Sequence, residues 1–242
     1  MTGCWLAIDT ASDRASTAAG VPPTAAASAI VSGTRRHAAE ILHLVDEVLR
    51  QAKARTADLA GIVVADGPGS FTGLRIGWAA AKGLAHEHSV PLLAFPALLA
   101  AAVGAAHHVG SGAIAVCFDA LRGQVFGAVY RLSPTTVETL VAPDVLTIAE
   151  LAARSPIPPR VAAGDGALRY PEQVLAWTGV VPLGLENLAP GAESLLALVA
   201  RGAVGRPVEA AGEPVYGRPA EAQAKWEARH GRPLPDPTGH AG

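Results

Sequence analysis

The sequence has few of the residues on which several classes of protein depend. Its two cysteines, Cys4 and Cys117, stand far apart and form no CxxC pair, which excludes a disulfide-stabilised scaffold and a cysteine-based zinc site. Aromatic residues make up 5% of the chain and charged residues 17%. The longest stretch without charge, residues 89–118, is interrupted by proline, glycine and histidine, so it contains no clean membrane span. We expect a soluble, cytoplasmic protein.

An excess of positive charge is also absent. The chain has 19 basic and 21 acidic residues, which gives a net charge of −2. Proteins that bind nucleic acid by themselves need clustered cations that neutralise phosphates. We therefore expect that this chain does not bind nucleic acid unaided.

The chain does contain the material for a packed core. Half of its residues are hydrophobic, which excludes an intrinsically disordered chain. Three apolar segments joined by short turns predict an antiparallel meander, and the alternating helices and strands that follow predict a mixed sheet covered by helices. The expected strands are residues 5–10, 16–21, 28–31, 61–65, 92–95, 113–119, 124–130 and 160–163, and the expected helices are 38–52, 74–85, 97–106, 147–154 and 193–203.

The helix predicted over residues 38–52 has the clearest pattern. Its apolar residues, among them Ile41, Leu42 and Val45, repeat every three or four positions, as on one face of an α-helix. Leu44 falls outside this stripe, where it is either an ordinary exposed leucine or widens the apolar face toward a partner.

The pattern of the first strand returns halfway along the chain. Residues 113–119 form an apolar run that ends in Asp119, as the first strand ends in Asp9. This repeat favours two related halves, with domains at residues 1–106 and 107–228 and a flexible tail at 229–242. The alternative is an ordinary succession of strands within one domain.

The glycine-rich segment over residues 67–77 joins a buried strand to a helix, a geometry that exposes backbone N–H groups at the helix N-terminus. It matches neither phosphate-binding fingerprint, however. A Walker loop needs Gly-Lys-Ser/Thr, whereas Leu74 and Arg75 follow the last loop glycine here. The dinucleotide motif is G-x-G-x-x-G, whereas Gly67, Gly69 and Gly73 leave one residue too many before the last glycine.

The helix after this loop has a stripe of small residues. Gly73, Gly77 and Ala81 recur every four residues, which lets a second helix approach closely, and Trp78 lies beside them. The stripe serves either a partner protein or packing against the helix's own sheet. If it serves a partner, Gly77→Arg is expected to break association and leave the monomer folded.

Residues that would support catalysis are few. The sequence contains no H-x-x-x-H metal motif and no G-x-S-x-G nucleophile motif. Asp9 and Thr10 end the first strand, where they either face a ligand or cap a turn. If they face a cleft that binds a nucleotide, the protein would instead be a nucleotide-dependent phosphotransferase or ATP hydrolase. The remaining candidates for that cleft are Asp119, Gly164, Asp165 and Gly166.

Several motifs together resemble the TsaB (YeaZ) family, a partner subunit in the bacterial synthesis of threonylcarbamoyladenosine in tRNA. The most specific is the run Asp66-Gly-Pro-Gly-Ser-Phe-Thr-Gly-Leu-Arg-Ile-Gly77. The first strand, Leu6-Ala-Ile-Asp9-Thr10, and the run Ala81-Lys-Gly-Leu-Ala85 resemble the family as well. Looser matches are Asp119-Ala-Leu-Arg122 and Pro214-Val-Tyr216-Gly-Arg218.

The resemblance implies a two-domain α/β fold of the actin, hexokinase and Hsp70 class, also called ribonuclease H-like. It implies a non-catalytic scaffold, a homodimer when alone, that acts beside the transferase TsaD and the ATPase TsaE to modify the adenosine next to the anticodon. No cofactor is firmly implied, and ATP or ADP would act at the level of the complex. The tRNA would be contacted only through that complex.

The resemblance also implies that the helices over 38–52 and 73–85 form the partner interface. The residues expected there are His37, Ile41, Leu44, Gly69, Ser70, Phe71, Thr72, Gly73, Arg75, Ile76, Gly77, Trp78 and Ala81.

Overall fold

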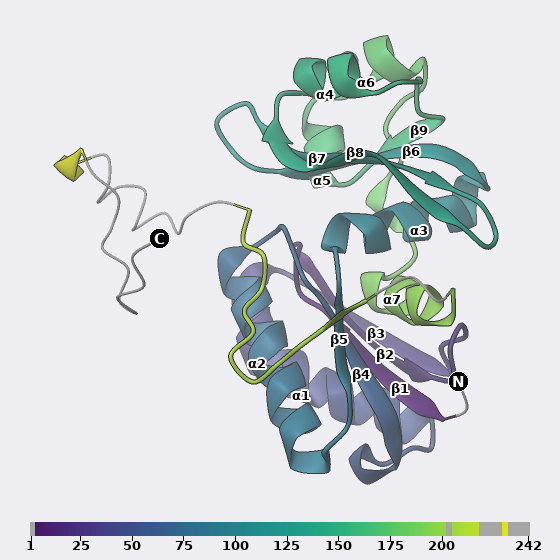
Figure 1. Ribbon diagram of the computed structural model, residues 1–242, viewed down its shortest axis with the longest axis vertical. Coiled ribbons are helices and arrows are strands. Elements are labelled where there is room, and N and C mark those ends of the chain that lie inside the picture. The colour runs from purple at the N-terminus through teal and green to yellow at the C-terminus, as the bar shows by residue number, and fades with distance from the viewer. Residues whose placement is uncertain (1–2, 202–204, 218–228, 232–242) are drawn as a thin grey trace.

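The computed structural model describes residues 3–201, 205–217 and 229–231, with the backbone alone described over 34–39. It consists of two β-sheets with helices between them and on their outer faces (Figure 1). This mixed α/β architecture is the one predicted from the sequence, and it is confirmed.

The first sheet has the strand order β10-β5-β4-β1-β2-β3. β1, β2 and β3 form the predicted antiparallel meander, and β4 and β5 continue the sheet parallel to β1. The strands are β1 (Cys4–Asp9), β2 (Arg14–Gly20), β3 (Ala27–Ser32), β4 (Leu59–Ala65), β5 (Leu92–Phe95) and β10 (Arg206–Pro207).

β1 is buried on both faces because it is apolar at every position from 5 to 8. Successive side chains of a strand point to opposite faces, so Trp5 and Ala7 pack into the core between the two sheets. Leu6 and Ile8 pack into a second core on the outer face. The strand therefore links the two cores and fixes the position of Asp9 and Thr10 at its end.

The second sheet repeats the strand order of the first. Its order β8-β7-β6-β9 corresponds to β3-β2-β1-β4, with antiparallel neighbours first and a parallel strand last. This shared order is the structural counterpart of the repeat in the sequence, while the predicted domain limits stay predictions. The strands are β6 (Gly112–Asp119), β7 (Val125–Leu132), β8 (Val137–Leu146) and β9 (Val161–Ala163).

The helices form three layers (Figure 1). Among the described residues, two α-helices cover the outer face of the first sheet, two lie between the sheets, and three cover the outer face of the second sheet. In that order they are α1 (Thr34–Gln51) and α2 (Phe71–His88); α3 (Ala97–Val109) and α7 (Gly191–Ala200); and α4 (Ile148–Arg154), α5 (Asp165–Arg169) and α6 (Pro171–Thr178).

The last part of the described chain returns to the first sheet. α7 packs against α3, β1 and β2, and β10 adds to the edge of the sheet beside β5. Residues 205–217, which we call the strap, then run along α2 (Figure 1). β8, α5, α6 and β10 were not among the predicted elements. Most of the predicted tail lies outside the described residues.

Within the described part of the chain, none of the helices combines the length and apolar character that crossing a membrane requires.

Candidate functional site

The glycine-rich loop between β4 and α2 packs tightly against the end of β1. The Ser70 backbone N–H donates to the Ala11 carbonyl oxygen at 2.7 Å. A Cβ at Gly69 would collide with the same oxygen, so only glycine fits there. The Ser70 hydroxyl accepts from the Gly73 N–H at 3.1 Å and caps α2. Two N–H groups that a phosphate would need are therefore already occupied, which disfavours the phosphate-loop interpretation.

The stripe of small residues on α2 faces the interior of this chain. A Cβ at Gly73 would collide with the Thr10 carbonyl oxygen, and one at Gly77 with the Thr10 hydroxyl. Ala81 is fully buried in the core beneath α1 and α2. The stripe thus lets α2 approach β1, and the expectation that Gly77→Arg leaves the monomer folded is wrong, because the larger side chain has no room beside Thr10.

Two other predicted interface residues are also interior. Ile41 and Trp78 are each 3% exposed, and the Trp78 indole N–H donates to the Ala65 carbonyl at 3.0 Å. On α1 the predicted pattern is reversed at two positions, since Leu42 is 60% exposed while Leu44 is half-buried. The side chain of His37 lies outside the described residues.

The remaining predicted interface residues do reach the surface. Thr72 and Arg75 are exposed, and Leu44, Gly69, Ser70, Phe71 and Ile76 are half-buried. One face of α2 carries accessible side chains, most of them small, at positions spaced by three or four residues, which we call the open stripe. It consists of Thr72, Ile76, Ala79 and Gly83.

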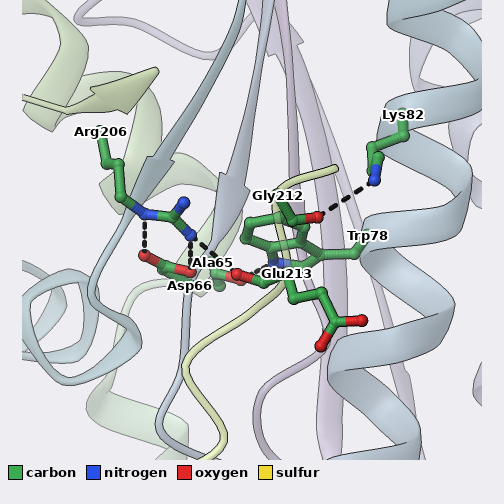
Figure 2. A network of polar contacts seen from close by, with 7 residues as sticks. All are labelled: Ala65, Asp66, Trp78, Lys82, Arg206, Gly212 and Glu213. Atoms are coloured by element: carbon green, nitrogen blue, oxygen red, sulfur yellow. Dashed lines mark hydrogen bonds and ion pairs between the residues drawn. The ribbon is translucent and has the colours of Figure 1, made fainter. Parts of the chain in front are cut away.

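The strap covers the adjacent face of α2, where it contacts the side chains of Trp78 and Lys82, one helical turn apart (Figure 2). Arg206 lies 5.2 Å from the Trp78 ring centroid, and Lys82 Nζ donates to the Gly212 carbonyl at 3.0 Å. Nearer the start of α2, the ring centroids of Phe71 and Tyr216 are 4.6 Å apart.

Arg206 fixes the strap to the end of β4. Its guanidinium makes two hydrogen bonds to the Asp66 carboxylate, at 2.9 and 2.7 Å, and a third to the Glu213 carbonyl at 3.0 Å (Figure 2). The Val215 N–H donates to the Asp66 carbonyl at 2.8 Å. No sequence pattern indicates this pair, because its members lie 140 residues apart.

Of the predicted nucleotide-binding residues, three line the same cavity. Asp9, Gly164 and Asp165 line a cavity of about 70 Å³ between the two sheets. Thr10, Asp119 and Gly166 do not line it, and Thr10 lies under α2 instead. Small-molecule sites usually have volumes of roughly 300–1,000 Å³. The cavity is therefore too small for a nucleotide in this conformation.

The carboxylates near this cavity are bound by backbone groups of the chain itself. Asp9 accepts from the Ala11 N–H at 2.9 Å, and burial raises its pKa to about 6. Asp165 accepts from the N–H groups of Asp119 and Gly166, at 3.1 and 3.0 Å, and burial raises its pKa as well. These carboxylates act as caps of turns, the alternative role considered for Asp9.

Asp119 has the same kind of role at the tip of the hairpin between β6 and β7. Its carboxylate accepts from the Leu121 N–H at 3.0 Å and pairs with Arg169 at 2.9 Å.

Gly191 packs so closely on Asp9 that a Cβ at Gly191 would collide with the Asp9 carboxylate. The start of α7 therefore forms the wall of the cavity next to Asp9. The described residues contain no group of three His, Cys, Asp or Glu side chains suited to a metal ion.

A larger open groove of about 890 Å³ lies at the far edge of the first sheet. It is lined by the turn before β3, the end of α3, the turn between β7 and β8, and α7, with Glu193 and Arg201 as its charged residues. The Ser28 hydroxyl is hydrogen-bonded to Glu193 across it. None of the residues predicted to bind a nucleotide belongs to this groove.

Comparison with known sequences gives two kinds of match. The model of the TsaD family, described as tRNA N6-adenosine threonylcarbamoyltransferase, matches residues 7–186. The tRNA threonylcarbamoyladenosine biosynthesis protein TsaB of Bacillus subtilis is 32% identical over 91% of this chain and 96% of its own length. A transferase of Listeria monocytogenes is 43% identical, but over only 25% of this chain and 17% of its own length.

Comparison with solved structures agrees with the match to the Bacillus subtilis TsaB sequence. YeaZ from Pseudomonas aeruginosa superposes with a TM-score of 0.70 at 28% identity, over 89% of this chain and 100% of that chain. The similarity to this structure therefore extends over both sheets.

Proposed function

Because this chain belongs to the TsaB family, we propose that it is a subunit of the machinery that makes threonylcarbamoyladenosine in tRNA. The observation that carries the proposal is the extent of the match. The chain aligns with 96% of the Bacillus subtilis TsaB sequence but with only 17% of the Listeria transferase. This contrast supports a subunit that works beside a TsaD-type transferase and is not itself the transferase.

The open stripe of α2, together with Leu44 of α1, supports the proposed docking surface. These positions are accessible, and the small residues Ala79 and Gly83 allow a partner helix to approach closely. Gly83 has no atom within 4 Å of the position where a Cβ would lie. The matched family model makes the TsaD-type partner a relative of this chain, so that equivalent helices would meet.

Three further parts of the proposal rest on the family resemblance. In the absence of TsaD the same surface would pair two copies of this chain. A TsaE-type ATPase would join the assembled complex, and tRNA would be contacted only there. The setting would be the cytoplasm.

Ala79→Arg tests the docking surface. Ala79 is exposed on α2, so we expect the variant to fold, while its long charged side chain prevents close approach of a partner helix. Size-exclusion chromatography with light scattering should detect a complex of the native chain with the TsaD-type subunit and none with Ala79→Arg. Ala149→Arg, on exposed α4 at the far side of the second sheet, is the matched control and should bind normally. Equal binding by all three would contradict the proposed surface.

The alternative function, a phosphotransferase or ATP hydrolase, is supported only by the grouping of Asp9, Gly164 and Asp165 around one cavity. Its volume of about 70 Å³ counts against it. Calorimetric titration of the isolated chain with ATP and magnesium distinguishes the two functions. A stoichiometric heat of binding that Asp9→Asn abolishes would favour the enzyme.

A further inference from the structure

Arg75 is an exposed side chain that is nevertheless held in one orientation. Its guanidinium carbon lies 4.4 Å from the centroid of the Phe71 ring and 5.7 Å from that of Tyr216. Its Nε donates to the Tyr216 hydroxyl at 3.1 Å. Stacking and hydrogen bonding together restrict the rotamers that a free arginine would sample.

The outer part of this guanidinium is available for binding. Among the described residues, Nε alone makes a hydrogen bond, and neither Nη group has a hydrogen-bond partner. Glu213 on the strap contributes a favourable charge interaction with Arg75 without a hydrogen bond. Two N–H donors in one plane match the two oxygens of a carboxylate, and a preorganised side chain loses less entropy on binding.

Arg75 is also next to the surface where a partner helix would dock. It lies one residue before Ile76 and one turn after Thr72, both in the open stripe. Arginine with aromatic neighbours at the border of an apolar patch is typical of the residues that dominate binding energy in protein interfaces.

We propose that Arg75 is the charged anchor of this docking surface and binds a carboxylate on the partner subunit. The inference rests on the proposed function, since the partner is the TsaD-type subunit. A protein carboxylate fits better than an RNA phosphate because the adjoining stripe of Ile76, Ala79 and Gly83 suits a helix. The chain's net charge of −2 also disfavours RNA.

The strap completes this site. Tyr216 comes from a segment 141 residues away from Arg75, and Arg206 holds that segment against Asp66. Tyr216 is therefore a positioning residue, which acts on the partner through Arg75.

The test measures the affinity of the full-length chain for the TsaD-type subunit of the same organism by calorimetry. Arg75→Gln should weaken binding by about tenfold or more, and Arg75→Lys by nearly as much, because lysine lacks the planar fork. Tyr216→Phe, which keeps the ring and loses the hydroxyl, should weaken binding by about threefold. Arg131→Gln removes an equal charge from an exposed pair on the second sheet and should leave the affinity unchanged.

The outcomes separate this inference from the proposed function. If Ala79→Arg abolishes binding while Arg75→Gln binds within about twofold of the native chain, the anchor inference is overturned and the docking surface stands. If the native chain does not bind the TsaD-type subunit, both are overturned. If Arg75→Gln leaves that affinity unchanged but weakens tRNA binding by the assembled complex, the ligand is a phosphate and the inference is wrong.

Discussion

At the scale of single residues, the stripe of Gly73, Gly77 and Ala81 shows what spacing reveals and what it leaves open. A repeat of small residues every four positions correctly indicates that something approaches α2 closely. Spacing cannot identify what approaches, because a strand end within the chain and a partner helix require the same room. Here it is Thr10 at the end of β1.

Alanine substitutions at two glycines of α2 should therefore act in opposite directions. Gly73→Ala should lower the free energy of unfolding by about 1–3 kcal/mol, because the added methyl collides with the Thr10 carbonyl oxygen. Gly83→Ala should raise it by about 0.5–1 kcal/mol, since the position is open and alanine favours the helix. Urea denaturation measures both, and equal effects would show that the packing of α2 on β1 is described incorrectly.

Asp9 gives the chain a defined dependence of stability on pH. Its pKa is about 6 in the folded protein against 3.8 for a free aspartate, because burial disfavours the charged form. The folded state therefore binds the proton more tightly than the unfolded state. This contribution to stability is complete below about pH 4 and is lost as the pH rises through 6.

Asp9→Asn should remove this loss while its side-chain oxygen still accepts from the Ala11 N–H. A shift of two pKa units corresponds to about 3 kcal/mol, so the variant should gain up to about that much relative to the native chain between pH 4 and 7. Denaturant unfolding at several pH values measures the difference. Asp58→Asn is the control, because hydrogen bonds from Arg55 lower the pKa of Asp58. A difference for Asp9→Asn that stays constant with pH would contradict the account.

At the scale of elements, the strap is the segment whose structure is least predictable from its own local sequence. Its strand β10 has only two residues, one of them a proline, and its main attachment joins Arg206 to Asp66. The strap is too irregular to show a periodic pattern of apolar residues that would predict it. Its position follows from long-range hydrogen bonds to the end of β4 and from contacts with one face of α2.

Arg206→Gln should release the strap. Asp66 is nearly buried, so loss of its charged partner should lower the free energy of unfolding by about 2 kcal/mol. The Val215 amide, which donates to the Asp66 carbonyl, should exchange with deuterium faster. Arg131→Gln breaks an exposed pair and should cost less than about 1 kcal/mol without changing that amide. Unchanged exchange at Val215 in Arg206→Gln would show that the pair does not hold the strap.

The elements that the sequence predicted are those with strong periodicity. The buried strands β1, β4 and β6 and the helices α1 and α2 each have a continuous or regularly spaced apolar pattern. The sequence pattern does not predict β8, because half of its residues are exposed and because it contains Pro143, which argues against a strand. The strand tolerates that proline because it lies at the sheet edge, where the pairing register with β7 shifts.

The candidate site was predictable only in part. Motif resemblance indicated the helices that carry the proposed surface, and Thr72, Arg75 and Ile76 on α2 are accessible. It could not separate exposed from interior positions, because that depends on how α2 rotates against β1. The contribution of Tyr216 to Arg75 depends on a contact between distant segments, and only the fold reveals it.

At the scale of the whole molecule, two sheets with one strand order share a core built around α3 and α7. The chain returns from the second sheet to the first, where α7 packs against Asp9 and the strap lies along α2. This arrangement presents one face of α2 outward. That accessible face supports the role proposed for the chain.

Reconstitution of the tRNA modification tests that role most directly. The measurement is the amount of N6-threonylcarbamoyladenosine in tRNA, by mass spectrometry of digested nucleosides, after incubation with the TsaD-type transferase, the TsaE-type ATPase and the activated threonylcarbamoyl donor. We predict that the product forms when this chain is added, that none forms with this chain alone, and that Ala79→Arg does not replace the native chain. Equal product formation without this chain would contradict the account.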